Sequence, residues 1–438
     1  MKLLDVLLAF TALSLLLLLA TALRQRSRRL QRLGLPEALI AGLLGLAIGP
    51  FSPLKLFPER VYTVWAQTPG VLITVVFASL FLGQPMPSPR QLWQRAASQT
   101  AFGLVLGFGQ YLVGGLTVLL VLGPLLGVNP LLACLIEVGF EGGHGTAAGM
   151  GPSFAELGLA SGEALGLAMA TVGVLAAVLI GSTLVAIGRR RQWLVSSATA
   201  AADPAPGEGP ITRPLLPAGP SPTIDALTLN LALIGAAVGL GMLLKEALVA
   251  SWPLLKAVPL FPLAMIGGLV VQQLLLRAGQ PQLANAPLQH SLGSLAMDVL
   301  MTAAMASLNL PLLDEAWLPF LVLALVGLAW NLAVFWWLAP RLFADAWFER
   351  GLTDFGQGTG VTATGLLLLR MADPYGRSDV LEAFSFKQLV FEPFLGGGLV
   401  TAFAPIALVS LGLSAWTALA AELTLAALGL GLVVRRPA

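Results

Sequence analysis

Two glycine-rich segments, one in each half of the chain, carry the residue types that could do chemistry. Residues 139–148 read GFEGGHGTAA, and residues 354–363 read DFGQGTGVTA. Both interrupt long apolar sequence, and unpaired backbone groups inside a membrane cost several kcal/mol each unless protein or a water-filled cavity surrounds them. Free N–H groups at helix starts bind anions, and unwound carbonyl groups bind cations. The pair of segments is therefore typical of the substrate site of a secondary transporter.

The expected substrate-binding residues come from both segments. Their glycines allow a ligand to approach the backbone closely, and their threonines supply hydroxyl groups. His144 has two open interpretations: it contacts a substrate carboxylate or carries a proton, or it clamps the carbonyl groups of its own segment. The full set is Gly142, Gly143, His144, Gly145, Thr146, Gly358, Thr359, Gly360, Thr362 and Thr364.

Acidic residues within apolar spans are the expected ion-coupling residues, because a charge at membrane depth is costly and usually functional. Asp298, Glu141 and Glu392 are these candidates. We expect Na⁺ near Asp298, Gly143 and Gly358. Glu137 and Asp354 are interpreted either as site residues or as helix caps near water.

Composition sets the class of protein. Of the 438 residues, 57% are hydrophobic and 11% are charged, whereas soluble domains carry about 25% charged residues. Cys134 is the single cysteine, so an intrachain disulfide is excluded. The sequence shows no nucleotide-binding loop, zinc-type cluster or Ser-His-Asp arrangement. We expect an all-α polytopic protein of the lipid bilayer, with no enzymatic activity, no cofactor and no nucleic-acid partner.

The apolar spans fall into two groups of five, followed by an extra span. The first repeat covers 1–188, a flexible cytoplasmic linker covers 189–223, and the second repeat covers 224–412. A further helix and basic tail cover 413–438. The spans are 3–23, 35–50, 66–83, 97–123 and 162–188, then 225–249, 259–277, 291–310, 316–340 and 381–412, then 414–434. Re-entrant hairpins are expected at about 129–155 and 346–372.

An odd number of spans per repeat gives the two repeats opposite orientations in the membrane. With the N-terminus outside and the C-terminus in the cytoplasm, most basic residues lie on the inner side, as the positive-inside rule requires. Lys387 is counted with these inner charges. The outer side keeps Lys2, Lys55, Arg60, Lys245 and Lys256.

The sequence resembles the bacterial sodium/glutamate symporter family. The string Gly142-Gly143-His144-Gly145-Thr146 is similar to the family's first hairpin, and the following residues 154–158 also fit. Residues 355–358 with 363–364 are similar to its second hairpin. Weaker likenesses lie at 35–38 and 292–295.

This resemblance implies two inverted five-span repeats with re-entrant hairpins, assembled as a homodimer in the inner (plasma) membrane. It implies Na⁺-coupled symport of L-glutamate or a related anion by an elevator-like alternating-access movement. On that basis residues 143–146 and 358–364 line the substrate and ion sites.

The chain departs from the family at several acidic positions. Asp298 stands where the family tends to have serine, and Glu141 replaces a small hydroxyl residue. Extra acidic groups leave open another amino acid or organic acid as substrate, with a proton as the coupling ion. A passive channel is a third interpretation, because paired re-entrant hairpins also occur in pores.

Overall fold

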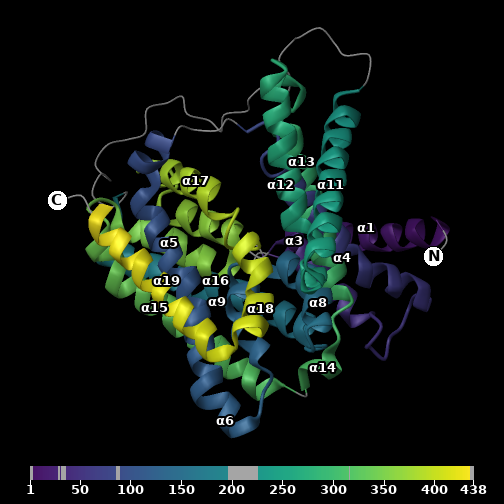
Figure 1. Ribbon diagram of the computed structural model, residues 1–438, viewed down its shortest axis with the longest axis horizontal. Helices are drawn as coiled ribbons and strands as arrows, with labels where there is room; N and C mark the ends of the chain where they lie inside the picture. The colour runs from purple at the N-terminus through teal and green to yellow at the C-terminus, as the bar shows by residue number, and fades with distance from the viewer. Residues whose placement is uncertain are drawn as a thin grey trace.

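The computed structural model describes residues 3–27, 30, 36–84, 89–195, 225–314 and 316–434. All regular structure in these ranges is helical, as the sequence predicts (Figure 1). Eight helices are long and apolar enough to cross a membrane. Residues 196–223 of the expected linker and the basic tail from 435 onward lie outside the described residues.

Each predicted span of the first half overlaps a helix, but the bounds differ, and α4 begins at residue 59 instead of 66. Helix α3 has 11 residues, whereas about 20 apolar residues are needed to cross a bilayer, so the predicted span 35–50 is shorter than expected. The elements are α1 (Leu3–Arg26), α3 (Glu37–Ala47), α4 (Glu59–Ser79), α5 (Pro89–Thr117), the π-helical turn η1 (Val118–Leu122), α6 (Gly123–Leu126), the 3-10 turn η2 (Pro130–Cys134), α7 (Leu135–Phe140), α8 (Gly143–Glu156) and α9 (Gly162–Arg190).

The second half corrects one predicted span. Residues 381–412 form two helices instead of one, because Gly396 and Gly397 adopt positive φ angles of 68° and 105° between them. Such angles end a helix, and glycine adopts them at little cost. The elements are α11 (Ala226–Ser251), η3 (Pro253–Ala257), α12 (Leu260–Arg277), η4 (Pro281–Leu283), α13 (Ala286–Ala306), α14 (Leu310–Asp314), α15 (Trp317–Leu342), α16 (Trp347–Ala372), α17 (Val380–Phe391), α18 (Leu399–Leu411) and α19 (Leu413–Val434).

Short polar side chains fix where several helices begin. The Asn129 side chain accepts a hydrogen bond from the Leu131 N–H at the start of η2. Asp225 does the same at α11, and Asn285 at α13. Each side chain satisfies a backbone N–H that has no partner within the helix.

The helices form two groups, with α8 in contact with both. In the first group α4 contacts α12 and α13, α3 contacts α1 and α13, and α11 contacts α12. In the second group α5 contacts α15, α17 and α19, and α16 contacts α9 and α15. Figure 1 shows α11, α12 and α13 on one side and α5, α15, α16, α17 and α19 on the other. Helix α8 contacts α4 and α13 as well as α9.

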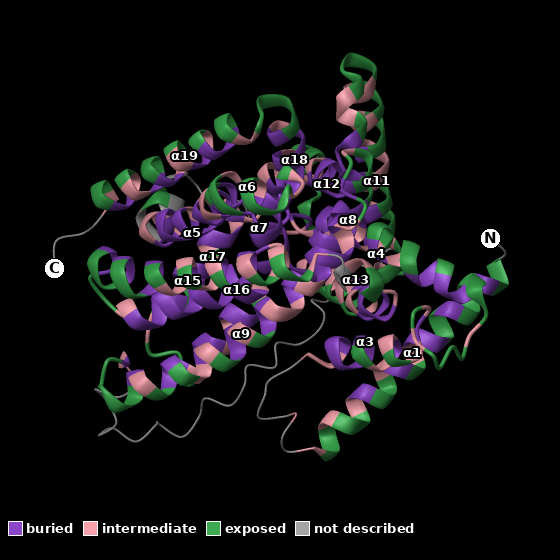
Figure 2. Cartoon of the chain, turned by 90° about the horizontal axis from the view of Figure 1, so that it is seen from below, coloured by how far each residue is buried: buried purple, intermediate pink, exposed green. Residues whose placement is uncertain are grey.

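Burial reverses the pattern of a soluble protein. The polar, glycine-rich residues 143–151 and 348–360 are buried throughout. In contrast, leucines such as Leu15 on α1, Leu231 on α11 and Leu432 on α19 are exposed. Figure 2 shows α8 and α16 largely buried at the centre and α19 exposed along its outer face. Apolar surface on this scale is expected to face lipid.

Candidate substrate and ion site

Both predicted interruptions of the helices are present. The first lies between α7 and α8, where Gly143 has a φ of +72°. The second lies inside α16, where Gly360 (φ −150°, ψ 37°) and Val361 (φ 67°, ψ 167°) leave the helical conformation. A positive φ is unusual for a β-branched residue and marks local strain.

The interruptions meet in space. The Val361 side chain lies where a Cβ atom on Gly143 would be, so only glycine fits at this position. The α17–α18 turn reaches the same region, because Gly397 lies against the hydroxyl group of Thr146. Residues from three parts of the chain thus meet in one region, and the sequence predicted two of these parts.

Each interruption brings together one helix start and one helix end. Helix α8 and the part of α16 after Val361 begin here, whereas α7 and the first part of α16 end here. The end of this first part is held by amides: the Gly358 carbonyl accepts hydrogen bonds from Gln110 Nε2 at 2.6 Å and Asn331 Nδ2 at 2.7 Å. Asn331 also donates to Thr359 Oγ1 at 3.0 Å.

Glu141, a predicted ion-coupling residue, follows α7 and is 4% exposed. Among the residues that the structure describes, neither of its carboxylate oxygens has a hydrogen-bond partner. Gly107 of α5 leaves the space for this carboxylate, since a Cβ atom there would be 2.6 Å from Glu141 Oε2. A buried carboxylate without a partner is costly unless it binds a cation or a proton.

The interpretation of Glu137 as a cap near water is wrong, because this residue is fully buried. Its carboxylate accepts hydrogen bonds from Tyr111 at 2.5 Å, Thr401 Oγ1 at 2.7 Å and the Gly396 N–H at 2.9 Å. Glu137 therefore fastens the start of the first interruption to α5 and to the α17–α18 turn.

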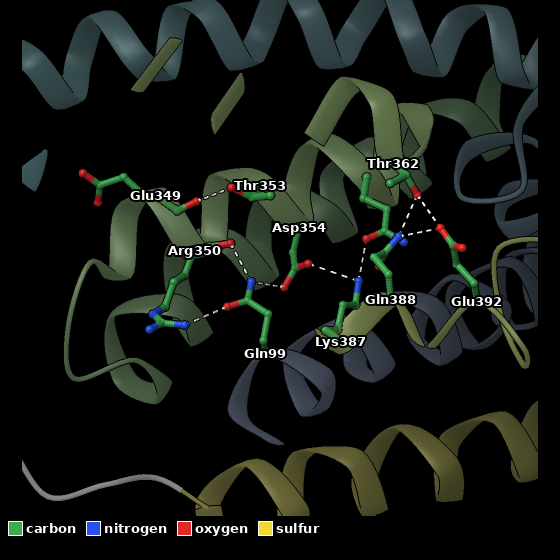
Figure 3. Close-up of polar contacts among 10 residues, drawn as sticks. Gln99, Glu349, Arg350, Thr353, Asp354, Thr362, Lys387, Gln388 and Glu392 are labelled. Carbon is green, nitrogen blue, oxygen red and sulfur yellow. Dashed lines mark hydrogen bonds and ion pairs between the residues drawn. The ribbon is translucent and has the colours of Figure 1, made fainter. Parts of the chain in front are cut away.

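Glu392 and Thr362, predicted for different roles, lie together (Figure 3). Thr362 Oγ1 donates to Glu392 Oε1 at 3.1 Å, and Gln388 Nε2 lies 2.7 Å from both of these oxygens. This cluster joins the residue after Val361 to the end of α17. It places a half-buried carboxylate beside the second interruption.

Asp354 and Lys387 form an ion pair that the sequence interpretation missed. Lys387 Nζ is 3.1 Å from Asp354 Oδ1 and donates to Gln357 Oε1 at 2.5 Å, and Gln99 Nε2 donates to Asp354 Oδ2 at 2.8 Å (Figure 3). The Asp354 and Lys387 side chains are at most 1% exposed. Of the two interpretations of Asp354, the cap near water is wrong, because its side chain is buried, and Lys387, which was counted with the inner-side charges, is buried inside the protein. A lysine within the apolar run 381–412 was the available signal.

Other predicted residues lie around this centre. His144 Nε2 is 3.0 Å from Thr171 Oγ1, so this hydrogen bond joins α8 to α9 and does not clamp the carbonyls of its own segment. Gly145 faces α4, where a Cβ atom would be 2.7 Å from Ile73 Cδ1. The Gly142 N–H donates to the Glu137 carbonyl at 2.9 Å. Thr364 is buried beside Gly360.

The predicted Na⁺ ligands are not brought together. Asp298 has an exposed side chain on α13, and the Gly358 carbonyl is already bound by two amides. In the described ranges, no group of three or more His, Cys, Asp or Glu side chains is placed to hold a metal ion. Glu141 is the predicted ion-coupling residue that lies at the interruptions with its carboxylate unpaired.

Two cavities open between the helix groups, and α8 lines one of them. One has a volume of about 590 Å³ and is lined by α4, α8, α12 and the segment before α12. The other has a volume of about 330 Å³ and is lined by α4, α9 and residues 307–312. Ala66 and Glu163 line both cavities. The boundary between the helix groups is therefore incompletely packed.

Apolar helices around a polar, interrupted centre define a multi-pass membrane transporter. The sequence model of the sodium/glutamate symporter family matches residues 2–366. The chain therefore belongs to the sodium/glutamate symporter family. The match contains both interruptions and ends before α17, so Lys387 and Glu392 lie beyond it.

Other comparisons add little. A comparison with curated proteins finds no match. Among solved structures, the chain is similar to the sodium proton antiporter MjNhaP1 from Methanocaldococcus jannaschii, at 18% identity and a TM-score of 0.39. That similarity covers 97% of this chain and 100% of the other. It is too low to extend the functional interpretation.

Proposed function

We propose that this protein is a secondary active transporter that carries L-glutamate together with Na⁺ by alternating access. The observation that carries the proposal is the contact between Gly143 and Val361, which joins two interrupted segments within a chain of this family. Interrupted helices that meet inside a membrane protein are the usual setting of a transporter's substrate site.

Two helix starts supply the groups for an anion. The first N–H groups of a helix have no partner within it, and its N-terminus carries a partial positive charge. Helix α8 and the second part of α16 both present such ends at the interruptions. We propose that they bind the carboxylates of glutamate, with Thr146 and Thr362 adding hydroxyl groups.

The cation is proposed to bind on the carboxylate side of the same region. Glu137, Glu141, Asp354 and Glu392 place four carboxylates among the central helices, and Lys387 is paired with Asp354. In the described part of the chain, the Glu141 carboxylate has no hydrogen-bond partner. Because an unpaired buried carboxylate needs a counter-charge, we propose that Na⁺ binds at Glu141 and the neighbouring end of α7.

The proposed movement is an elevator-like shift of the second helix group and its interruptions against the first. This movement is supported by the contact of α8 with α4 and α12, where glycines of α8 let the helices approach closely. A Cβ atom on Gly149 would lie 3.0 Å from both Ile73 and Phe261. The two cavities between the helix groups leave room for displacement. We retain inverted repeats with re-entrant hairpins, a homodimer and an inner-membrane location with a cytoplasmic C-terminus as parts of this proposal.

Radiolabelled glutamate uptake into proteoliposomes, with Na⁺ and pH gradients imposed separately, tests the proposal. We expect accumulation driven by an inward Na⁺ gradient and abolished when choline replaces Na⁺. Uptake that ignores the Na⁺ gradient would reject Na⁺ coupling. Absence of glutamate counterflow under every gradient would reject glutamate as the substrate.

Proton-coupled transport of another amino acid or organic acid is the second candidate, and Glu141 is the observation that favours it. An unpartnered buried carboxylate can be neutralised by a proton as well as balanced by a metal cation. Accumulation driven by a pH gradient alone identifies this case. Ion currents far above carrier turnover would instead identify a passive channel.

A further inference from the structure

The Lys387 side chain lies in a closely packed polar and aromatic environment within the core, which is called the enclosure below. Its ammonium group contacts Asp354 Oδ1 at 3.1 Å and Gln357 Oε1 at 2.5 Å, and it stands 3.9 Å from the centre of the Phe391 ring. Gly103 of α5 leaves space for the end of the side chain, since a Cβ atom there would lie 2.6 Å from Lys387 Cε.

These partners are the kind that a small monovalent cation uses. Carboxylate and amide oxygens are ligands for hard cations, and an aromatic face attracts a cation through its ring quadrupole. The Asp354 carboxylate is further held by Gln99 at 2.8 Å, so the enclosure is built by side chains from α5, α16 and α17. Gly107, one turn further along α5, leaves the corresponding space for Glu141, whose carboxylate oxygens have no hydrogen-bond partner within the described ranges.

We propose that the Lys387 ammonium is a tethered cation that occupies a cation site in the core, so that this site never exchanges Na⁺ with solution. The protein itself then supplies one positive charge that a transporter without this lysine would take from the medium. Exchangeable cation binding is left to the carboxylate of Glu141. This role of Lys387 rests on the proposed cation coupling. It lowers by one the number of cations that the protein exchanges with the medium.

Replacing Lys387 should create an additional Na⁺ site, which is a gain of function that can be measured. In Lys387→Met the apolar chain still fills the space, but the Asp354 carboxylate loses its counter-charge and becomes available to Na⁺. We expect the unfolding temperature of purified Lys387→Met to rise with NaCl, measured against choline chloride at equal ionic strength, more steeply than that of the wild type. One additional bound Na⁺ corresponds to a further increase of about 1.5 °C per tenfold NaCl in a chain of this length.

Matched variants separate Na⁺ binding from a structural role. Asp354→Asn combined with Lys387→Met removes both charges, so its Na⁺ dependence should return to that of the wild type. Lys387→Gln keeps a hydrogen-bonding group beside Asp354, and should show the same gain if Lys387→Met does not fold. The proposal would be overturned if the unfolding temperature of the single variant that folds, Lys387→Met or Lys387→Gln, depended on NaCl no more steeply than that of the wild type. If both single variants fold only when NaCl is present, that result would support the proposal.

The thermal measurement contains no glutamate, so it is independent of the transported substrate. If glutamate uptake fails, the proposed function is rejected, but the NaCl dependence of the unfolding temperature still tests the role of Lys387. In proteoliposomes that do transport, the number of Na⁺ ions per substrate should rise by one in the single variant. An unchanged ratio would count against the tethered cation.

Discussion

The side chain of Val361 lies directly against the backbone of Gly143, so the two helix interruptions touch. Both residues have positive φ angles, 67° for Val361 and 72° for Gly143. Glycine adopts such an angle at little cost, but for Val361 the strain is about 1–3 kcal/mol and persists where the surroundings hold the backbone in place. This contact is where the N-terminus of α8 and the second part of α16 come together.

Gly143→Ala should abolish transport. Alanine is strained at this positive φ, by about 1–2 kcal/mol, and its methyl group would also overlap Val361. We therefore expect the interruptions to separate and counterflow to fall to background, as measured in proteoliposomes with equal amounts of protein.

Gly158→Ala is the matched control for this substitution. Gly158 has a φ of +94°, yet nothing lies within 4 Å of an added Cβ atom. It should show the backbone strain without the overlap, and retain transport. Equal loss of transport in both variants would mean that strain alone explains the effect at Gly143.

Glu141→Gln should lose cation-driven accumulation without losing stability. The amide cannot balance a cation, but it also removes a buried charge that has no partner. We expect an unfolding temperature no lower than that of the wild type, together with uptake that no longer responds to the driving gradient.

Glu137→Gln provides the contrast, because Glu137 is the neighbouring carboxylate whose oxygens are hydrogen-bonded. Its new NH₂ group would face existing donors, which should destabilise the protein by about 1–3 kcal/mol. If Glu141→Gln were the more destabilising of the two, the assignment of Glu141 as the unpaired carboxylate would be wrong.

Cross-linking α8 to α4 should stop transport reversibly. With Cys134→Ala as background, Ile73→Cys and Gly149→Cys place two thiols at a contact where a Cβ atom on Gly149 would be 3.0 Å from Ile73. Mercuric ion should bridge them and block uptake, and dithiothreitol should restore it. Unimpaired uptake by quantitatively bridged protein would rule out movement at this interface.

Asp373, in the loop between α16 and α17, should give the protein an acid-dependent stability. Burial alone raises the pKa of Asp373, but hydrogen bonds from the Ser378 side chain and from the backbone N–H groups of Arg377 and Ser378 outweigh burial and lower the pKa. A lowered pKa gives stability that is complete above the ordinary value of 3.8 and is lost as the pH falls through the folded-state value.

Asp373→Asn tests this loop by thermal unfolding between pH 6 and pH 3. The variant should unfold at a lower temperature than the wild type at pH 6, and the difference should shrink toward pH 3. A difference that is constant across this range would show that the Asp373 charge contributes nothing.

The helical spans and both interruptions could be predicted from the sequence because each follows from local composition. Long apolar runs produce membrane helices, and clusters of glycine such as Gly142-Gly143 end them. The interruption near Gly396 was missed because its glycines were included in an apolar run. The pairing of Asp354 with Lys387 was missed because sequence alone does not reveal that two distant charges pair.

The sequence by itself determined the class of protein, the family and the two interrupted segments, since hydrophobicity and glycine content act on neighbouring residues. Only the tertiary structure decided which acidic groups share the centre. It placed Asp298 on an exposed helix face, left Glu141 unpaired and gave Asp354 a lysine. The physical reason is that the free energy of a buried charge depends on which groups the fold brings within a few ångströms, and those groups come from distant parts of the chain.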